Sequence, residues 1–361
     1  MKQGWEIKKI RDICDKASSN IAQNKITELD GDFPVYGASG YVQNIDFFHR
    51  DSPYIGIVKD GAGVGRVNIY PAYSSLLGTL QYILPKDGYL LEYVAYALKS
   101  LDLASFASGA TIPHIYFKNY GEIEIPVAPL TEQEKIVEEL DCLSGIIKKK
   151  KQQLKEYDAL AQSIFYEMFG NPIDNEKGWE IKTIGDVCVL KSGDSSANNT
   201  SVGTLPYVKV GDMNIEENIP YITTSSTFVS KSENIKGIFP IGTTIFPKRG
   251  GAIYTNKKRL TAVEICCDLN TMGVIPMNDV LPLYIYYYFV LLDFGELCNG
   301  AAIPQINNKD IAPLKVCVPP LAIQQEFASK IEAIEKQKEL LKQSIAETEG
   351  LFNSRMDYYF N

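Results

Sequence analysis

A glycine-rich run, Asp60-Gly-Ala-Gly-Val-Gly-Arg66, has the composition of a loop that binds phosphate. A loop that holds a nucleotide cofactor opens a helix, so that the phosphates meet the helix N-terminus. Here the strand-like segment Val67-Asn-Ile-Tyr70 follows and ends at Pro71. The run therefore favours a turn that approaches the phosphate chain of a nucleic acid over a dinucleotide or S-adenosylmethionine site.

A second glycine turn, Pro247-Lys-Arg-Gly-Gly-Ala252, occupies the equivalent place in the second half of the chain and is basic. From Lys248 to Arg259 there are five basic residues and no acidic residue, although the chain has a net charge of −8. A positive patch beside a glycine turn favours contact with the DNA backbone, and a solvated loop is the alternative. The run Lys148–Lys151 covers all faces of a helix, which indicates a solvated surface.

Residue patterns for catalysis are missing from the sequence. We find no HExxH, no GxSxG, no P-loop and no carboxylate cluster with a nuclease-like lysine. Asn171-Pro-Ile-Asp174 lacks the second proline and the aromatic residue with which amino-methyltransferases stack a flipped base. Two histidines and seven cysteines without a CxxC pattern disfavour a metal site. We therefore predict no catalytic residues, no metal ligands and no cofactor bound by this chain.

Composition gives a second set of expectations. The 361 residues suffice for two or three domains with substantial cores. No apolar run reaches membrane-spanning length, and the N-terminus lacks a signal-peptide core. The cysteines are scattered singly apart from Cys266-Cys267, which is typical of a reducing compartment. We expect a cytoplasmic protein without a membrane partner.

The elements that must position these turns occur twice. A shift of 191 residues takes the stretch Thr131–Phe169 onto Ala322–Phe360, and it takes Gly109-Ala-Thr-Ile-Pro-His-Ile115 onto Gly300-Ala-Ala-Ile-Pro-Gln-Ile306. Each half opens with Gly-Trp-Glu, at Gly4 and at Gly178. We expect Trp5 and Trp179 to anchor the first strand of each half, and stacking on a base is the alternative. The repeat predicts one architecture in two copies.

The two 39-residue stretches are predicted to be long helices that pack on each other, most simply antiparallel. Neither contains proline, and apolar residues recur every three or four positions. Thr131 is the expected N-cap of the first helix, after the prolines of Pro126-Val-Ala-Pro129. The predicted helix-pair interface comprises Leu140, Leu143, Ile147, Leu154, Tyr157, Ile331, Ile334, Leu341, Ile345 and Phe352.

The segments between these blocks favour strands, with one helix near the end of each copy. In the first copy the predicted strands are 33–36, 54–58, 67–70, 80–84 and 122–126, and the helix is 90–103. In the second copy they are 205–210, 237–247, 260–267, 273–276 and 314–318, and the helix is 281–294. A turn-forming linker, Asn171–Gly178, joins the copies.

Taken together, these blocks resemble the specificity (S) subunit of type I restriction–modification systems over the whole chain. The resemblance is carried by the two Gly-Trp-Glu openers, Phe33-Pro-Val-Tyr-Gly-Ala-Ser-Gly40, Lys59-Asp-Gly-Ala-Gly63, Phe246-Pro-Lys-Arg-Gly250, and Ile125-Pro-Val-Ala-Pro-Leu-Thr-Glu-Gln133. It implies an α+β fold in which two mixed, strand-rich target-recognition domains are separated by a pair of long antiparallel coiled-coil helices, with an internal pseudo-twofold repeat. The expected boundaries are recognition domains at 1–128 and 171–319 and spacer helices at 129–170 and 320–361.

The resemblance also implies a function. The chain would be a non-catalytic subunit in which each recognition domain reads half of a bipartite target in double-stranded DNA. The helices would set the spacer and dock two modification (methyltransferase) subunits, and restriction (endonuclease/translocase) subunits would join them. S-adenosylmethionine, ATP and magnesium are expected on those partners. The candidate DNA contacts are Tyr36, Ser39, Lys59, Asp60, Gly61, Arg66, Lys209, Lys248, Arg249, Gly250, Lys257, Lys258 and Arg259.

Two other classes of function stay open at this point. A solitary DNA methyltransferase would need a helix after Gly65 and a base-flipping motif. A coiled-coil interaction scaffold without DNA contact would fit the net charge of −8. Salt-dependent DNA binding separates the scaffold from the DNA reader.

Overall fold

The computed structural model describes residues 3–361 except 110–112, 173, 195–202, 232–236 and 299–303. It contains two compact units: residues 1–152 with 341–361, and residues 153–340. Parts of the repeated motifs Gly109–Ile115 and Gly300–Ile306, and Ile173 of the linker, lie outside the described residues.

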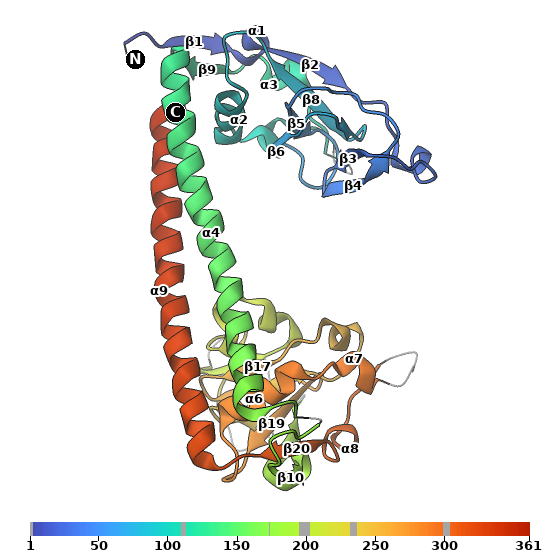
Figure 1. Ribbon diagram of the computed structural model, residues 1–361, viewed down its shortest axis with the longest axis vertical. Helices are drawn as coiled ribbons and strands as arrows, with labels where there is room; N and C mark the ends of the chain where they lie inside the picture. The colour runs from blue at the N-terminus through green and yellow to red at the C-terminus, as the bar shows by residue number, and fades with distance from the viewer. Residues whose placement is uncertain (1–2, 110–112, 173, 195–202, 232–236, 299–303) are drawn as a thin grey trace. The chain divides into compact units, whose positions relative to one another are not determined.

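Apart from its parts of the two long helices, the first unit consists mainly of strands, with one ten-residue helix packed against them (Figure 1). Its four-stranded sheet has the order β2-β8-β5-β6, and a three-stranded sheet has the order β4-β3-β7. The opening strand β1 pairs antiparallel with β9. The strands are β1 (Glu6–Lys9), β2 (Cys14–Ser18), β3 (Phe33–Gly37), β4 (Gly40–Ile45), β5 (Tyr54–Val58), β6 (Val67–Tyr70), β7 (Ser75–Leu76), β8 (Leu80–Pro85) and β9 (Glu124–Val127). The helix is α2 (Leu91–Ser100), flanked by the single turns α1 (Ile10–Ile13) and α3 (Phe117–Tyr120).

The second unit repeats this plan. The opener β10 pairs antiparallel with β20, as β1 does with β9. The sheets have the orders β11-β19-β16-β17-β13 and β14-β12-β18-β15. The strands are β10 (Glu180–Thr183), β11 (Cys188–Ser192), β12 (Leu205–Val208), β13 (Tyr221–Ile222), β14 (Phe228–Val229), β15 (Ile238–Phe239), β16 (Thr244–Pro247), β17 (Arg259–Thr261), β18 (Ile265–Cys267), β19 (Thr271–Pro276) and β20 (Lys315–Val318). The helices are α5 (Ile184–Val187), α6 (Pro282–Leu291), α7 (Phe294–Leu297) and α8 (Asn308–Ile311).

A buried glutamine ties each long helix to its own unit. The Oε1 of Gln133 accepts a hydrogen bond from the backbone N–H of Leu90, just before α2, at 2.9 Å. In the second unit Gln324 accepts from Leu281, just before α6, at 2.8 Å. Both amide groups also donate to a backbone carbonyl five residues upstream. Because both side-chain amides are buried and hydrogen-bonded through oxygen and nitrogen, they fix the start of each long helix against the recognition fold.

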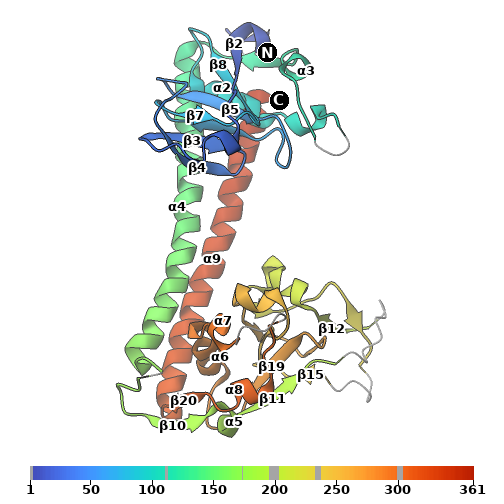
Figure 2. The same ribbon diagram turned by 90° about the vertical axis from the view of Figure 1, so that its right-hand side faces the viewer.

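The long helices predicted from periodicity are present. They are α4 (Leu130–Phe169) and α9 (Leu321–Phe360), and they lie side by side in Figures 1 and 2. The predicted N-cap was two residues too late, because α4 begins at Leu130 and the carbonyl of Pro129 accepts the first helical hydrogen bonds, from Glu132 and Gln133. Thr131 is therefore inside the first turn.

Contacts within each unit show that the helices run antiparallel. In the first unit Arg355 binds the Glu139 carboxylate through Nε and Nη2, and the Lys150 ammonium donates to Ser344 and Thr348. In the second unit the Lys338 ammonium lies 2.8 Å from Asp158. The two lysines lie in mainly apolar seams, and their fixed partners specify which turns of the helices face each other.

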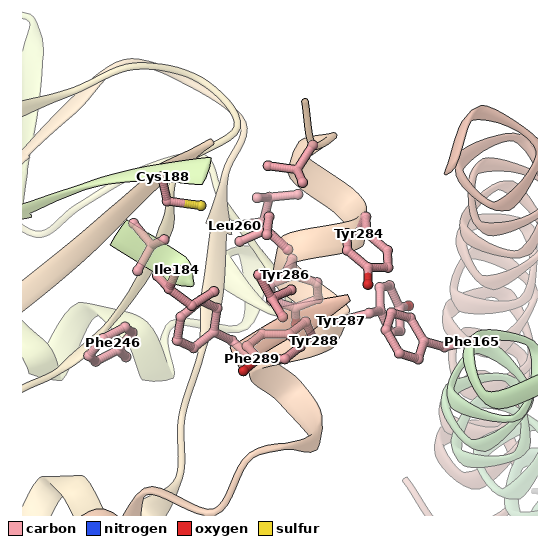
Figure 3. Packing of buried hydrophobic residues seen from close by; sticks show 14 of the residues in the cluster. Phe165, Ile184, Cys188, Phe246, Leu260, Tyr284, Tyr286, Tyr287, Tyr288 and Phe289 are labelled. Atoms are coloured by element: carbon pink, nitrogen blue, oxygen red, sulfur yellow. The ribbon is translucent and has the colours of Figure 1, made fainter. Parts of the chain in front are cut away.

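Aromatic residues of the helices complete the core of each unit. In the second unit Phe165 of α4 stacks on Tyr284 of α6 at 5.5 Å and meets Phe327 of α9 at 5.6 Å. Figure 3 shows α6 between Phe165 and the strand side of this core. In the first unit Phe360 of α9 meets Tyr93 of α2 at 5.2 Å. Each recognition fold therefore depends on residues from both long helices.

Each predicted strand overlaps an observed strand, whereas β2, β4, β7, β11, β13 and β14 were not predicted. The predicted strand 237–247 is divided into β15 and β16 at Gly242, whose φ of 83° requires a turn. The predicted strand 260–267 is divided into β17 and β18. The helices predicted at 90–103 and 281–294 end earlier, at Ser100 and Leu291. Trp5 is buried as expected, whereas Trp179 is only half-buried.

Candidate nucleic-acid interface

The glycine turn of the first unit is held by three backbone hydrogen bonds. The N–H of Lys59 donates to Thr79, the N–H of Gly61 to Pro113, and the N–H of Ile115 to Lys59, at 2.9 to 3.0 Å. A strand, β6, follows the turn, so the turn does not open a helix. Gly61 has a φ of 79° and open space where a side chain would project. The turn is thus a rigid, outward-facing feature whose backbone a ligand can approach closely.

The second unit has the same turn at the equivalent place. The N–H of Lys248 donates to Asn270, the N–H of Gly250 to Pro304, and the N–H of Ile306 to Lys248, at 2.8 to 2.9 Å. Gly250 has a φ of 71° and again open space beside it. The two turns share their hydrogen-bond pattern although the intervening sequences differ, so the glycine turn belongs to the repeated frame.

One residue in each turn lies beside a partner from the neighbouring segment, and this pair is half-buried in the first unit and exposed in the second. Asp60 pairs with His114 across an antiparallel bridge, and Arg249 pairs with Gln305 in the same way. These are non-hydrogen-bonded pairs, in which Cα atoms are about 4.5 Å apart and the side chains lie close together on one face. The Asp60 carboxylate contacts Nδ1 of His114. Arg249 and Gln305 are both exposed.

Arg66 and Lys59 lie at the edge of the first turn. The exposed Arg66 folds back over the turn, and its guanidinium donates to the carbonyls of Gly63 and Ala62 at 3.2 and 3.1 Å. The Lys59 ammonium lies 4.0 Å from the Asp60 carboxylate. The first turn therefore carries a mixed pattern of charge.

The basic segment of the second unit divides into buried and accessible residues. Lys248 is buried, and its ammonium donates to Ser192 Oγ at 2.6 Å. Lys258 is 3% exposed, donates to the carbonyl of Leu292 at 2.6 Å, and lies 4.2 Å from the centre of the Phe294 ring. Burial lowers the pKa of both lysines, that of Lys258 to about 8. In this conformation neither ammonium is accessible to a ligand.

The other basic residues of this unit are closer to the surface. Arg249 is exposed. Lys257 is half-buried, and its ammonium donates a hydrogen bond to Oδ1 of Asn214. Arg259 is half-buried, donates to the carbonyls of Met213 and Lys258, and has its pKa lowered by burial. The Lys209 ammonium lies 5.6 Å from the centre of the Tyr207 ring. Arg249 is thus the most accessible charge of the basic segment.

An open groove of about 800 Å³ adjoins the glycine turn of the first unit. Three loops line it, at 19–23, 37–42 and 77–79, and Thr79 also accepts the hydrogen bond that holds the turn. Ser39 is exposed on its wall, whereas Tyr36 is half-buried against Tyr70 at 5.0 Å. The exposed polar side chains Asn20 and Gln23 also line it, and sequence reasoning missed both. No spacing distinguished them from other loop residues.

The described residues contain no group of three histidine, cysteine or acidic side chains that could hold a metal ion. Within the same residues, no helix is both long and apolar enough to span a membrane.

The family model described as type I restriction modification DNA specificity domain matches residues 2–156 and 176–349, one match in each copy of the repeat. The chain belongs to this family. It is a specificity subunit, the non-catalytic chain that recognises the DNA target within a type I restriction–modification complex.

Individual relatives agree with the assignment. The specificity subunit is 23% identical to the MjaIX specificity subunit of Methanocaldococcus jannaschii, over 91% of this chain and 86% of the relative. Its fold is similar to that of the type I S subunit from M. genitalium, with a TM-score of 0.58, 16% identity and coverage of 99% and 96%. A chain from a study of assembly and conformational transition in the type I system gives a TM-score of 0.60, 18% identity and coverage of 98% and 97%.

The residues predicted for the helix pair of the specificity subunit fall into two groups. Four are buried: Leu140, Ile331, Ile334 and Ile345. Six are half-buried: Leu143, Ile147, Leu154, Tyr157, Leu341 and Phe352. Tyr157 and Phe352 pack at the edge of the second and the first core, respectively. For the other four, half-burial is what a two-helix pair gives where no recognition fold covers it.

Two residues beside the glycine turns, His114 and Gln305, were also absent from the predicted DNA contacts. A signal for them was present in the sequence, because they occupy the same place in the Gly109–Ile115 and Gly300–Ile306 motifs and differ in chemistry. What the sequence did not reveal is the bridge that sets them beside Asp60 and Arg249.

Proposed function

We propose that each unit of this specificity subunit reads one half of a bipartite target in double-stranded DNA. The observation that carries this proposal is the pair of glycine turns with the same backbone hydrogen bonds and different outward side chains. A shared frame with different side chains is what two readers of different base sequences need, because the frame provides position and the side chains provide sequence discrimination.

The proposed division of the chain follows the repeat. Residues 1–128 and 171–319 form the two target-recognition domains, and residues 129–170 and 320–361 form the spacer helices. The helix pair acts as the ruler between the half-sites and docks two modification subunits. The fixed polar partners of Lys150 and Lys338 support a ruler of defined register.

Cofactors and further partners follow from this division of labour. The modification subunits bind S-adenosylmethionine and methylate adenine, and restriction subunits add ATP- and magnesium-dependent translocation and cleavage. The complex acts in the cytoplasm. This chain contributes recognition and geometry to those reactions.

The proposed DNA interface is smaller than the sequence suggested. It comprises the groove with Ser39, the turn residues Lys59, Asp60, Gly61 and Arg66, and, in the second unit, Lys209, Arg249, Gly250, Lys257 and Arg259. Tyr36 supports the groove wall. Lys248 and Lys258 are left out, because their ammonium groups are buried and bonded to protein atoms.

Mapping of methylated adenines tests the proposal. Genomes from cells with and without this gene are compared, with the modification subunits present in both. We expect one bipartite motif, two short sequences at a fixed separation, to lose methylation without the gene. An unchanged set of methylated motifs, or loss of an undivided motif, contradicts the proposal.

A further inference from the structure

We infer that the outward-facing pair at each glycine turn reads base edges, and that Arg249 with Gln305 recognises a guanine-containing step in the half-site of the second unit. This inference rests on the proposed function and names residues and base chemistry within it. It is carried by geometry that the two units share.

The frame of the pair is the same in both units. The backbone N–H of Lys59 donates to the carbonyl of Thr79 in the first unit, and the N–H of Lys248 donates to that of Asn270 in the second. Thr79 and Asn270 are equivalent under the 191-residue shift. The residues on either side of the pair, Lys248 and Ile306 in the second unit, are buried. Since side chains alternate across extended backbone, Arg249 and Gln305 project to the outer face together.

The chemistry on this frame differs between the copies. The residues that flank the pair are the same in both, Lys59 with Ile115 and Lys248 with Ile306. The outward pair changes from Asp60 with His114 to Arg249 with Gln305. A position that serves phosphate contact alone is not expected to hold a carboxylate in one copy, because phosphate repels it. A position that reads bases holds whichever group its base requires.

Each side chain has a base to which it is suited. The guanidinium of Arg249 matches O6 and N7 of guanine, and the amide of Gln305 matches N6 and N7 of adenine. The carboxylate of Asp60 accepts from the N4 amino group of cytosine. Arg249 is exposed, and within the described residues its guanidinium has no ion-pair partner. Gln305 donates to Asn307 at 2.7 Å, which holds its amide beside the bridge.

The test uses the assembled methyltransferase with Arg249→Gln, Arg249→Lys and the parent chain. Arg249→Lys keeps the charge but loses the planar fork that binds guanine through two hydrogen bonds. We expect both variants to lose discrimination at one base pair of one half-site by roughly 5- to 150-fold, and the other half-site to remain unchanged. Methylated motifs and binding to matched single-base variants of the site are measured.

Lys309→Ala is the matched control, since Lys309 is an exposed lysine four residues beyond Gln305. It is expected to leave the motif unchanged. The inference is overturned if Arg249→Lys behaves as the parent, or if Arg249→Gln weakens all DNA equally, because either result makes Arg249 a phosphate contact. Gln305→Ala provides an independent variant, and an unaltered motif with normal discrimination also overturns the inference.

Failure of this inference is distinguishable from failure of the proposed function. If the parent methylates a bipartite motif and the variants leave every base unchanged, the proposed function stands and the reading pair is wrong. If the parent motif is not bipartite, the proposed function itself is wrong.

Discussion

Among the single residues of the basic segment, accessibility separates those that can meet DNA from those that stabilise the fold. Lys257 and Lys258 are neighbours, yet Lys257 is half-buried at the surface and Lys258 is enclosed against Leu292 and Phe294. These adjacent lysines therefore differ in accessibility to a ligand. A substitution of Lys258 can therefore serve as the control for a substitution of Lys257.

We predict that Lys257→Ala weakens binding of the assembled complex to specific and nonspecific DNA alike. One phosphate contact fewer should reduce the slope of log affinity against log salt concentration by about one. The matched variant Lys258→Met should leave the slope unchanged, because its ammonium does not reach the surface. Affinities would be measured across a salt series, and equal slopes for Lys257→Ala and the parent would place Lys257 away from the DNA.

The ion pair between Glu139 and Arg355 makes the stability of the first unit depend on pH. Hydrogen bonds from Arg355 lower the pKa of Glu139, and the Tyr359 hydroxyl contributes in the same direction. A lowered pKa in the folded state stabilises the fold above the ordinary glutamate range, and this contribution is lost as the pH falls through the folded pKa. Glu139→Gln should therefore lower the free energy of unfolding at neutral pH by about 0.5 kcal/mol, a value discounted for partial exposure.

The measurement can be restricted to the first unit. Each unit has one tryptophan, so a Trp179→Phe background leaves Trp5 as the reporter. Denaturant unfolding at neutral pH should distinguish Glu139→Gln from the parent, and unfolding at an acid pH below the folded pKa of Glu139 should not. A difference of the same size at both pH values would mean that the ion pair is not its cause.

At the scale of the elements, the sequence allowed the long helices to be predicted to within a residue at their start, because apolar periodicity over many turns is a strong signal. Short strands give a weaker signal in the sequence. The segment 260–267 has strand composition throughout, but β17 joins one sheet and β18 another, and that choice is set by tertiary pairing. The burial of Lys258 could not be predicted for the same reason, because it depends on Leu292 and Phe294, which are far along the chain.

The pairing of α4 and α9 can be tested by a substitution at Ile345. Ile345 is 7% exposed on α9, whereas Leu340 of the same helix is 51% exposed. Ile345→Asp places a carboxylate in the apolar seam and should destabilise the first unit by about 2 to 4 kcal/mol. Leu340→Asp should cost less than about 0.5 kcal/mol. Thermal unfolding and site-specific methylation would be recorded together, and full stability of Ile345→Asp would contradict the pairing.

For the whole molecule, the two copies of one plan predict modular exchange. Replacing residues 15–108 with the equivalent stretch of a relative should change one half-site only, because residues 189–299 of the second copy are untouched. The separation of the half-sites should also survive, since α4 and α9 are retained. Methylated motifs of parent and chimera would be sequenced. A folded, active chimera in which both half-sites change together would exclude independent readers.

The core of the first unit also has a consequence for the order in which the protein can fold. Phe360 and Met356 pack in the same core as Trp5 and Tyr93, although they are translated after the whole of residues 153–340. At usual elongation rates this interval lasts roughly 10 to 40 s, during which the first half must wait on the ribosome with part of its apolar surface uncovered. The second unit is continuous in sequence and closes first. A nonsense codon near residue 350 is therefore expected to damage the reader that was synthesised earliest.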